Sequence, residues 1–201
     1  GKSAILLIPE IALTPQTVER IKSRFASLDT RVAVLHSHLS EGERHDEWHK
    51  INDGHARIVV GARSAVFAPV AALGLIVVDE EHEPSYKQED APRYHARDLA
   101  VVRAKAENCA VLLGSATPSI ESFHNAATGK YRLATLAARA DDRRMPVIRI
   151  VDMRQEARKA KAPALLSERL VTAIKARLER KEQSILFLNR RGFSTSLLCS
   201  Q

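Results

Sequence analysis

Short apolar runs alternate with segments of helical periodicity through the first two thirds of the chain. Thr14 can cap one helix with Pro15 at its first position, and Ser40 with Glu43 forms a capping box for the next. This alternation favours a mostly parallel sheet covered by helices on both faces. The sequence therefore predicts an α/β fold with strands over Ala4–Ile8, Arg31–Leu35, Arg57–Gly61, Leu75–Asp79 and Cys109–Gly114.

The alternation loosens after Tyr131, which indicates a change of organisation. Residues 1–136 are predicted to form a first domain, and residues 137–163 an interdomain linker that contains a strand-like run, Val147–Val151. A second unit is expected over residues 164–201. It begins with Ser167 as the cap of a helix that ends near Arg180, followed by a strand over Ser184–Leu188.

Composition and charge narrow the class of protein. Hydrophobic residues make up 45% of the chain, which is enough for a globular core. No apolar run approaches the roughly 20 residues of a membrane span, so we expect a cytoplasmic protein with no membrane contact. The net charge of +7 suits a polyanionic partner such as nucleic acid, although a basic solvated surface explains it as well.

The strongest chemical signal is an apolar run that ends at Val78 and leads directly into Asp79, Glu80, Glu81 and His82. A buried parallel strand presents such acids at the carboxyl edge of its sheet, where ligands bind. One acid can hold Mg²⁺ against phosphates, and the next can deprotonate an attacking water. An acidic loop after a core strand is an equally good explanation of this motif alone.

A second polar segment, Gly114-Ser115-Ala116-Thr117-Pro118, ends the next predicted strand and favours a shared polar edge. The two segments resemble motifs II (DExH) and III (SAT) of superfamily 2 helicases. That resemblance implies a role for each residue: Asp79 serves Mg²⁺, Glu80 is the general base, and His82, Ser115 and Thr117 relay the nucleotide state to a DNA site.

Longer strings resemble the bacterial replication-restart helicases of this superfamily. These are Pro9–Gln16, Gly61–Ala65, in which Ala62 stands where Thr is usual, and Leu186–Phe193. The resemblance implies a first RecA-like lobe over residues 1–136, the linker 137–163, and the start of a second RecA-like lobe over residues 164–201. Gly1-Lys2-Ser3 imitates a phosphate-binding loop but precedes a strand instead of a helix, so we expect the P-loop to be missing.

Residues 83–98 resemble the aromatic-rich loop of the same helicases, with Pro92 where Phe is frequent. Aromatic faces between cations suit single strands, because bases stack while cations hold phosphates. The alternative is a surface loop pinned by two half-buried tyrosines. Over the whole chain the predicted DNA contacts are Thr14, Gln16, Arg63, Ser64, Tyr86, Lys87, Arg93, Tyr94, Arg97, Arg190 and Arg191.

Two further segments concern metals. Leu197–Gln201 resembles the entry to a zinc-binding insertion, which makes Cys199 a zinc ligand in an intact protein only, because one thiolate cannot complete a four-ligand site. The pair His45 and His49 imitates a metalloprotease motif, but the glutamate between them is misplaced. A solvated helix face is therefore the better interpretation.

The resemblance implies an ATP-dependent 3′→5′ DNA helicase that acts in replication restart and primosome assembly at stalled forks. Its cofactors would be ATP and Mg²⁺, with Zn²⁺ in the intact protein. Its partners would be forked and single-stranded DNA, single-stranded-DNA-binding protein, primosome proteins and the loader of the replicative helicase, at the nucleoid. Without a P-loop we expect no useful ATP hydrolysis by this chain alone. Two alternatives stay open: another superfamily 2 translocase such as a restriction-enzyme motor, and a non-catalytic nucleic-acid-binding module.

Overall fold

The computed structural model describes residues 1–26, 31–136, 146–160 and 166–187. The chain divides into two compact units, Gly1–Thr135 and Leu136–Gln201. The division does not test the predicted linker or second lobe, which stay predictions. Among the described residues, no helix is long and apolar enough to cross a membrane.

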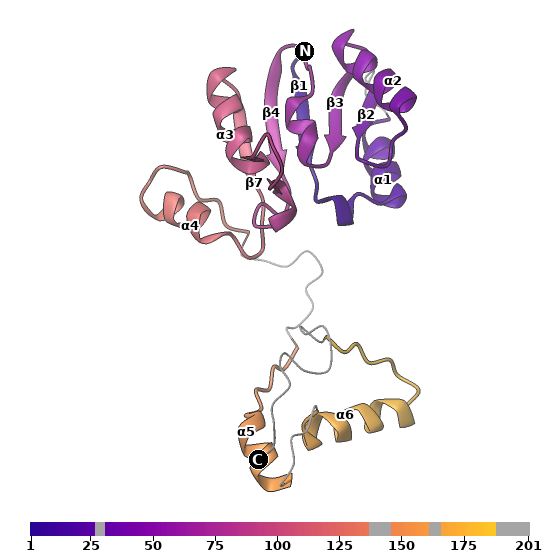
Figure 1. Ribbon diagram of the computed structural model, residues 1–201, viewed down its shortest axis with the longest axis vertical. Coiled ribbons are helices and arrows are strands. Elements are labelled where there is room, and N and C mark those ends of the chain that lie inside the picture. The colour runs from indigo at the N-terminus through magenta and orange to yellow at the C-terminus, as the bar shows by residue number, and fades with distance from the viewer. Residues whose placement is uncertain (27–30, 137–145, 161–165, 188–201) are drawn as a thin grey trace. The chain divides into compact units, whose positions relative to one another are not determined.

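Five parallel strands form the sheet of the first unit, in the order β2-β3-β1-β4-β7 (Figure 1). The predicted parallel sheet is confirmed, and no strand end differs from the prediction by more than two residues. One shift affects the chemistry: β4 ends at Val78, so Asp79 lies beyond the strand instead of closing it. The strands are β1 (Ser3–Leu7), β2 (Arg31–Leu35), β3 (Ala56–Gly61), β4 (Leu73–Val78) and β7 (Ala110–Leu113).

Two helices of this unit, α1 and α2, begin at the predicted caps. Thr14 Oγ1 accepts a hydrogen bond from Thr17 N, and the Ser40–Glu43 capping box is complete. The α-helices are α1 (Pro15–Phe25), α2 (Glu41–Asn52), α3 (Ala96–Ala106) and α4 (Ile120–Ala127). Short 3₁₀ turns occupy η1 (Glu10–Ala12), η2 (Arg63–Phe67) and η3 (Pro84–Tyr86).

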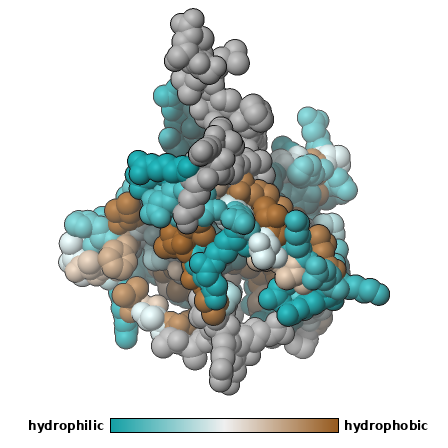
Figure 2. Space-filling view, turned by 90° about the horizontal axis from the view of Figure 1, so that it is seen from below, coloured by the Kyte–Doolittle hydropathy of each residue, from teal (hydrophilic) through white to brown (hydrophobic). Residues whose placement is uncertain are grey.

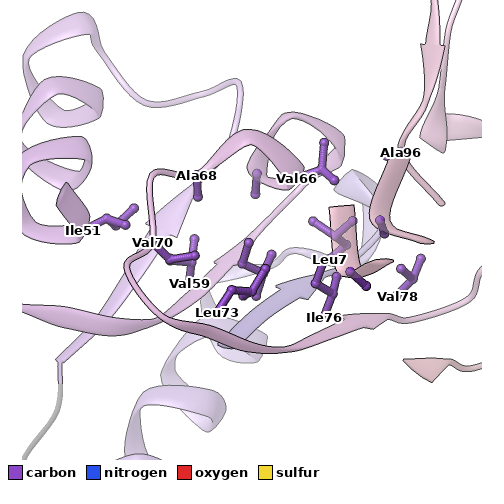
Figure 3. Close-up of a cluster of buried hydrophobic side chains, with 14 of the residues drawn as sticks. Leu7, Ile51, Val59, Val66, Ala68, Val70, Leu73, Ile76, Val78 and Ala96 are labelled. Carbon is purple, nitrogen blue, oxygen red and sulfur yellow. The ribbon is translucent and has the colours of Figure 1, made fainter. Parts of the chain in front are cut away.

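One face of the sheet carries the hydrophobic core (Figure 3). Side chains from α2, η2 and α3 pack there against β1, β3 and β4. Three alanines of α3, at positions 96, 100 and 104, are at most 2% exposed, and their small size lets this helix lie close to the sheet. The core strand residues are Ile5, Leu7, Ala33, Ala56, Val59, Leu73, Ile76 and Val78.

Helix α1 lies on the opposite face. The crossover from β1 to β2 runs across the sheet in the direction opposite to the three that follow, and parallel crossovers are right-handed. Val32 and Val34 of the edge strand β2 line a groove with Val18 of α1 and Glu47 of α2. The prediction of helices on both faces is confirmed.

Gly61 lies at the end of β3, between the ends of the neighbouring strands β2 and β1. Its carbonyl oxygen accepts a hydrogen bond from Ile8 N, and the next residue, Ala62, donates to Leu35 O at 3.1 Å. A Cβ at position 61 would collide with that Leu35 oxygen and with the Ala65 side chain. Glycine is therefore required by the close approach of three strand ends.

A small hairpin stands between β4 and α3. Its strands, β5 (Lys87–Gln88) and β6 (Tyr94–His95), pair antiparallel. The hairpin falls within the segment predicted to contact DNA.

The second unit contains α5 (Met153–Ala160) and α6 (Glu168–Glu179). Ser167 caps α6, as predicted. The strands expected over Val147–Val151 and Ser184–Leu188 are wrong for the described residues, which are non-helical and unpaired there; Leu188 lies outside them. Ile150 and Ile185 are 94% and 97% exposed. A strand is stabilised by cross-strand partners, and an apolar run without one gains little from being extended.

Candidate active site

Asp79 and Glu80 follow β4 at the carboxyl edge of the sheet, and both side chains are exposed. The main chain of Asp79 continues the sheet for one more bond, from its N–H to Leu7 O at 2.9 Å. Glu80 then takes a left-handed conformation with φ of 46°, and its N–H donates to Asp79 Oδ1. A non-glycine residue in that region is strained, and such strain gathers at functional sites.

The end of β7 lies directly beside this turn. Gly114 N donates to Val78 O, and Glu81 N donates to Gly114 O at 3.0 Å. His82 Nδ1 lies 2.7 Å from Ser115 Oγ. The predicted meeting of the two polar segments is therefore confirmed, and Thr117 Oγ1 completes it at 3.5 Å from His82 Nε2.

Glu81 was missed by the sequence analysis, although it lies between two residues that were chosen. Its side chain is 1% exposed. Burial alone would raise the pKa of Glu81, yet hydrogen bonds from Ser119, Ser122 and Arg97 outweigh it and hold the pKa below its ordinary value. No pattern in the sequence separates this acid from its exposed neighbours, because its donors come from α3 and α4.

The structure corrects the assignment of Arg97 to DNA. This residue is only 9% exposed, and its guanidinium donates to Glu81 Oε2 at 3.1 Å and to Ser119 Oγ at 2.7 Å. Although burial acts the other way, its bonds to Asp98 and Glu81 raise the pKa of Arg97. A guanidinium committed to buried carboxylate and hydroxyl groups has little left for a phosphate.

Tyr86 needs the same correction. It is 1% exposed, so its ring cannot stack on a base, and its hydroxyl donates to the main-chain oxygen of Asp79 at 2.7 Å. Burial, with the nearby charge of Asp79, raises the pKa of this hydroxyl far above its ordinary value. Tyr86 anchors the turn that carries the exposed acids.

Arg63 also has a structural role, because its guanidinium binds main-chain oxygens. It is half-buried, and Nη1 donates to Lys87 O at 2.7 Å and to Ser85 O at 3.4 Å. It thereby ties the turn after β3 to the hairpin.

The other predicted DNA contacts differ in exposure. Tyr94 is half-buried, with its ring edge-on to Phe67 at 5.1 Å between centroids. The exposed residues are Thr14, Gln16, Ser64, Lys87 and Arg93, while Arg190 and Arg191 lie outside the described residues. The predicted zinc ligand, Cys199, also lies outside them.

Asp79 fits a magnesium ion. Among the described residues, no three His, Cys, Asp or Glu side chains are grouped to hold a metal. Mg²⁺ does not need such a group, since it keeps several waters and binds through one or two carboxylates together with phosphate oxygens. An exposed carboxylate at a strand end suits it. Cys109, by contrast, is a poor metal ligand, because burial raises the pKa of its thiol.

The sequence profile of the DEAD/DEAH box helicases matches residues 1–126, which include the sheet, the acidic turn and the segment after β7. The chain belongs to the DEAD/DEAH box helicase family. In this family the sheet of the first unit is a RecA-like helicase lobe, as the motif resemblance implied.

In sequence, the chain is 51% identical over 199 residues to the replication restart protein PriA of Bacillus subtilis (strain 168). It is 48% identical over 201 residues to the replication restart protein PriA of Chlamydia pneumoniae. These matches cover 99% and 100% of the chain, and 24% and 26% of the relatives. The chain thus spans about a quarter of the length of the curated relatives it matches. The resemblance to replication-restart helicases is confirmed.

Among solved structures, a structure of RecG bound to a three-way DNA junction matches the helicase chain with a TM-score of 0.43 and 21% sequence identity. The match covers 64% of this chain and 16% of that one.

Proposed function

We propose that a protein carrying this chain is an ATP-dependent 3′→5′ DNA helicase of replication restart and primosome assembly at stalled forks. One observation carries the proposal: the exposed acids after β4 are joined to the segment after β7 through His82 and Ser115. An edge that can hold a nucleotide is thereby linked to a segment that can report its state. The 51% identity to a replication restart protein supports the biological setting.

Each residue of the edge has a distinct role in the proposal. Bound ATP and Mg²⁺ supply a phosphoanhydride bond and a charge-neutralising cation. Asp79 holds the ion, and Glu80 orients a water and accepts its proton. Glu80 Oε2 lies 3.6 Å from His82 Nδ1, so a change of charge at the base reaches His82 directly. His82, Ser115 and Thr117 then pass this change toward the DNA.

The hairpin supports a contact with single-stranded DNA. Lys87, Arg93 and Tyr94 line a shallow cavity there, together with Gln88, Glu89 and His95. Exposed cations can hold phosphates while the free part of the Tyr94 ring stacks on a base. The net charge of +7 favours the same partner.

The remaining parts of the proposal rest on the similarity to replication restart proteins. They are single-stranded-DNA-binding protein, primosome proteins and the helicase loader as partners, Zn²⁺ bound partly through Cys199 in the intact protein, and a cytoplasmic, nucleoid-associated location. The same similarity favours this proposal over a restriction-enzyme motor.

The test is ATP turnover by the full-length protein with and without DNA, for wild type and Glu80→Gln. General bases contribute about 10²- to 10⁴-fold, so the variant is expected to lose at least about 100-fold in turnover while still binding ATP. Glu83→Gln, the same change three residues further along, is the matched control. Unchanged turnover in Glu80→Gln would show that Glu80 is not the general base. Absence of turnover in the wild-type protein would favour a non-catalytic nucleic-acid-binding module.

A further inference from the structure

Helix α2 carries two histidines that the proposed function does not use. His45 and His49 are four residues apart, which places them on one face of the helix, one turn from each other. Both side chains are exposed. Hydrophilic residues occupy many separate places in the view of Figure 2, so polarity alone singles out no binding site. The geometry of this pair is more specific.

The two imidazole rings converge at their Nε2 atoms. These atoms lie 3.1 Å apart, although the ring centroids are 4.3 Å apart and the ring planes are inclined at 60°. Two imidazole nitrogens bound to one ion at about 2.0–2.1 Å lie about 2.9 Å apart at a right angle and about 3.3 Å apart at the tetrahedral angle. The observed separation lies between these values, so one metal ion can bind both nitrogens with little movement of either ring.

Helix α2 holds the pair in this position. Ser40 and Glu43 form a complete capping box at its start, and Ile51 near its end is only 1% exposed. Glu47, which lies between the two histidines, accepts a hydrogen bond from Val34 N of β2 at 2.8 Å. Because the helix is fixed at both ends and in the middle, a bound ion has little chain to order, and this favours binding.

The surroundings of the pair favour a cation. Helix α2 contains four carboxylates and two Lys or Arg side chains, a formal charge of −2 in a chain whose net charge is +7. Asp46 Oδ1 lies 4.0 Å from His45 Nδ1. A carboxylate near one imidazole nitrogen favours a proton on that nitrogen and leaves the lone pair on the other one, which can then bind a metal.

We propose that His45 and His49 form a surface site for a divalent transition metal such as Cu²⁺ or Zn²⁺. Imidazole suits these ions, and among the divalent first-row metals Cu²⁺ binds such ligands most tightly. In the described part of the chain no third His, Cys, Asp or Glu side chain joins the pair, so the other coordination positions are left to water. Binding is therefore reversible, unlike that of a closed four-ligand site. The site shares no residue with the proposed magnesium and zinc ligands and does not depend on the proposed helicase activity.

The alternative to a metal site is a hydrogen bond between the two rings, in which one Nε2 donates to the other. Such a bond contributes little at an exposed position, because water competes for both nitrogens. A metal ion takes the place of the shared proton, which moves to Nδ1 of the same ring. The two explanations therefore predict different responses to added metal.

Trp48 provides a local signal for the test. It is the only tryptophan of the chain, and its ring lies edge-on to His49 with 5.2 Å between the centroids. Because Cu²⁺ quenches tryptophan fluorescence at short range, titration of the 201-residue chain with Cu²⁺ is expected to quench Trp48. His45→Asn should weaken the apparent affinity at least about tenfold. Mg²⁺, which prefers oxygen ligands, should cause no quenching.

Two control variants separate the pair from histidine content. His38→Asn removes an exposed histidine from the loop before α2 and should leave the affinity unchanged. Arg44→His combined with His45→Asn keeps the number of histidines but turns one imidazole about 100° away around the helix, so the affinity should again fall at least about tenfold. Equal Cu²⁺ affinity in the wild type and in this spacing variant, or in the wild type and His45→Asn, overturns the proposal.

Unfolding in urea measures the same binding without fluorescence quenching. An ion that binds the folded helix raises the midpoint of unfolding, by an amount that grows with the concentration of the free ion. Zn²⁺ should therefore raise the midpoint of the wild type more than that of His45→Asn. An equal shift in both proteins would mean that the ion acts at another place and would contradict the proposal. Neither measurement involves ATP or DNA, so failure of the proposed function leaves both results unaffected.

Discussion

The two sides of the turn after β4 carry the same kind of residue in opposite surroundings. Glu80 faces solvent at the carboxyl edge, whereas Glu81, the next residue, is enclosed by Arg97, Ser119 and Ser122. The exposed side can bind a ligand, and the buried side fixes the direction in which the exposed side points. The loss of either acid can therefore change the free energy of unfolding by very different amounts, although the two are adjacent in one motif.

The largest expected effect separates the two acids by stability. Glu81→Ala removes one of the two carboxylates paired with Arg97 and the acceptor shared by Ser119 and Ser122, and should lower the free energy of unfolding by about 3–5 kcal/mol. Glu80→Ala, at an exposed position, should change it by less than about 0.5 kcal/mol. Urea unfolding of the 201-residue chain measures both, and equal losses would contradict the comparison.

A smaller effect concerns pH. The pKa of Glu81 is lower in the folded protein than its ordinary value of 4.5, so below that pH the unfolded chain binds a proton more readily than the folded chain does. Stability from this group is fully present at neutral pH and is lost as pH falls from 4.5 through the lowered pKa. Unfolding midpoints between pH 7 and pH 3 should therefore decline less steeply in Glu81→Gln than in wild type. Identical slopes would exclude Glu81 as the source.

Tyr86→Phe tests the anchor between the two sides. The substitution removes the partly buried hydrogen bond from the Tyr86 hydroxyl to Asp79 O and should cost about 1 kcal/mol. Tyr94→Phe is the control, since its ring contact with Phe67 survives, and it should cost less than about 0.5 kcal/mol. If the two substitutions cost the same, Tyr86 does not anchor the turn through its hydroxyl.

The smallest expected effect is a gain. Glu80→Gly removes the backbone strain of a residue with a side chain at φ of 46°, which should stabilise the folded state by about 1 kcal/mol. Glycine also raises the conformational entropy of the unfolded chain, and this offsets about half of that stabilisation. The chain should become more stable by roughly 0.5 kcal/mol in urea unfolding. A loss instead would mean that the Glu80 side chain makes a stabilising contact on the exposed side.

Local signals explain how much of the fold was predictable. The caps at Thr14, Ser40 and Ser167 each accept a hydrogen bond from a backbone N–H of their own helix. Because these partners are close in the sequence, the caps can be predicted from it. The meeting of His82 with Ser115 followed from a general property of parallel sheets, that strand ends share an edge. Both kinds of prediction need no knowledge of which side chains pack together.

The errors concern residues whose partners are distant in the chain. Tyr86 and Arg97 have the composition of a DNA-binding loop, and the sequence assigned them to one. The structure instead places Tyr86 under Asp79 and joins Arg97 to an acid 16 residues away. The apolar run at Ile185 was predicted as a strand because it has the residue pattern of one. A strand also needs a neighbouring strand to pair with, and the pattern does not specify that neighbour.

The order of strands and helices, the polar carboxyl edge and the resemblance to helicases came from the sequence, because hydrophobic periodicity and contiguous motifs are properties of short segments. Which of two adjacent glutamates is buried, which tyrosine supports the turn and which arginine faces inward were decided by packing. Those outcomes depend on α3 and α4 meeting at the end of β4, and the free energy of burying a charge is settled by the donors that surround it in space.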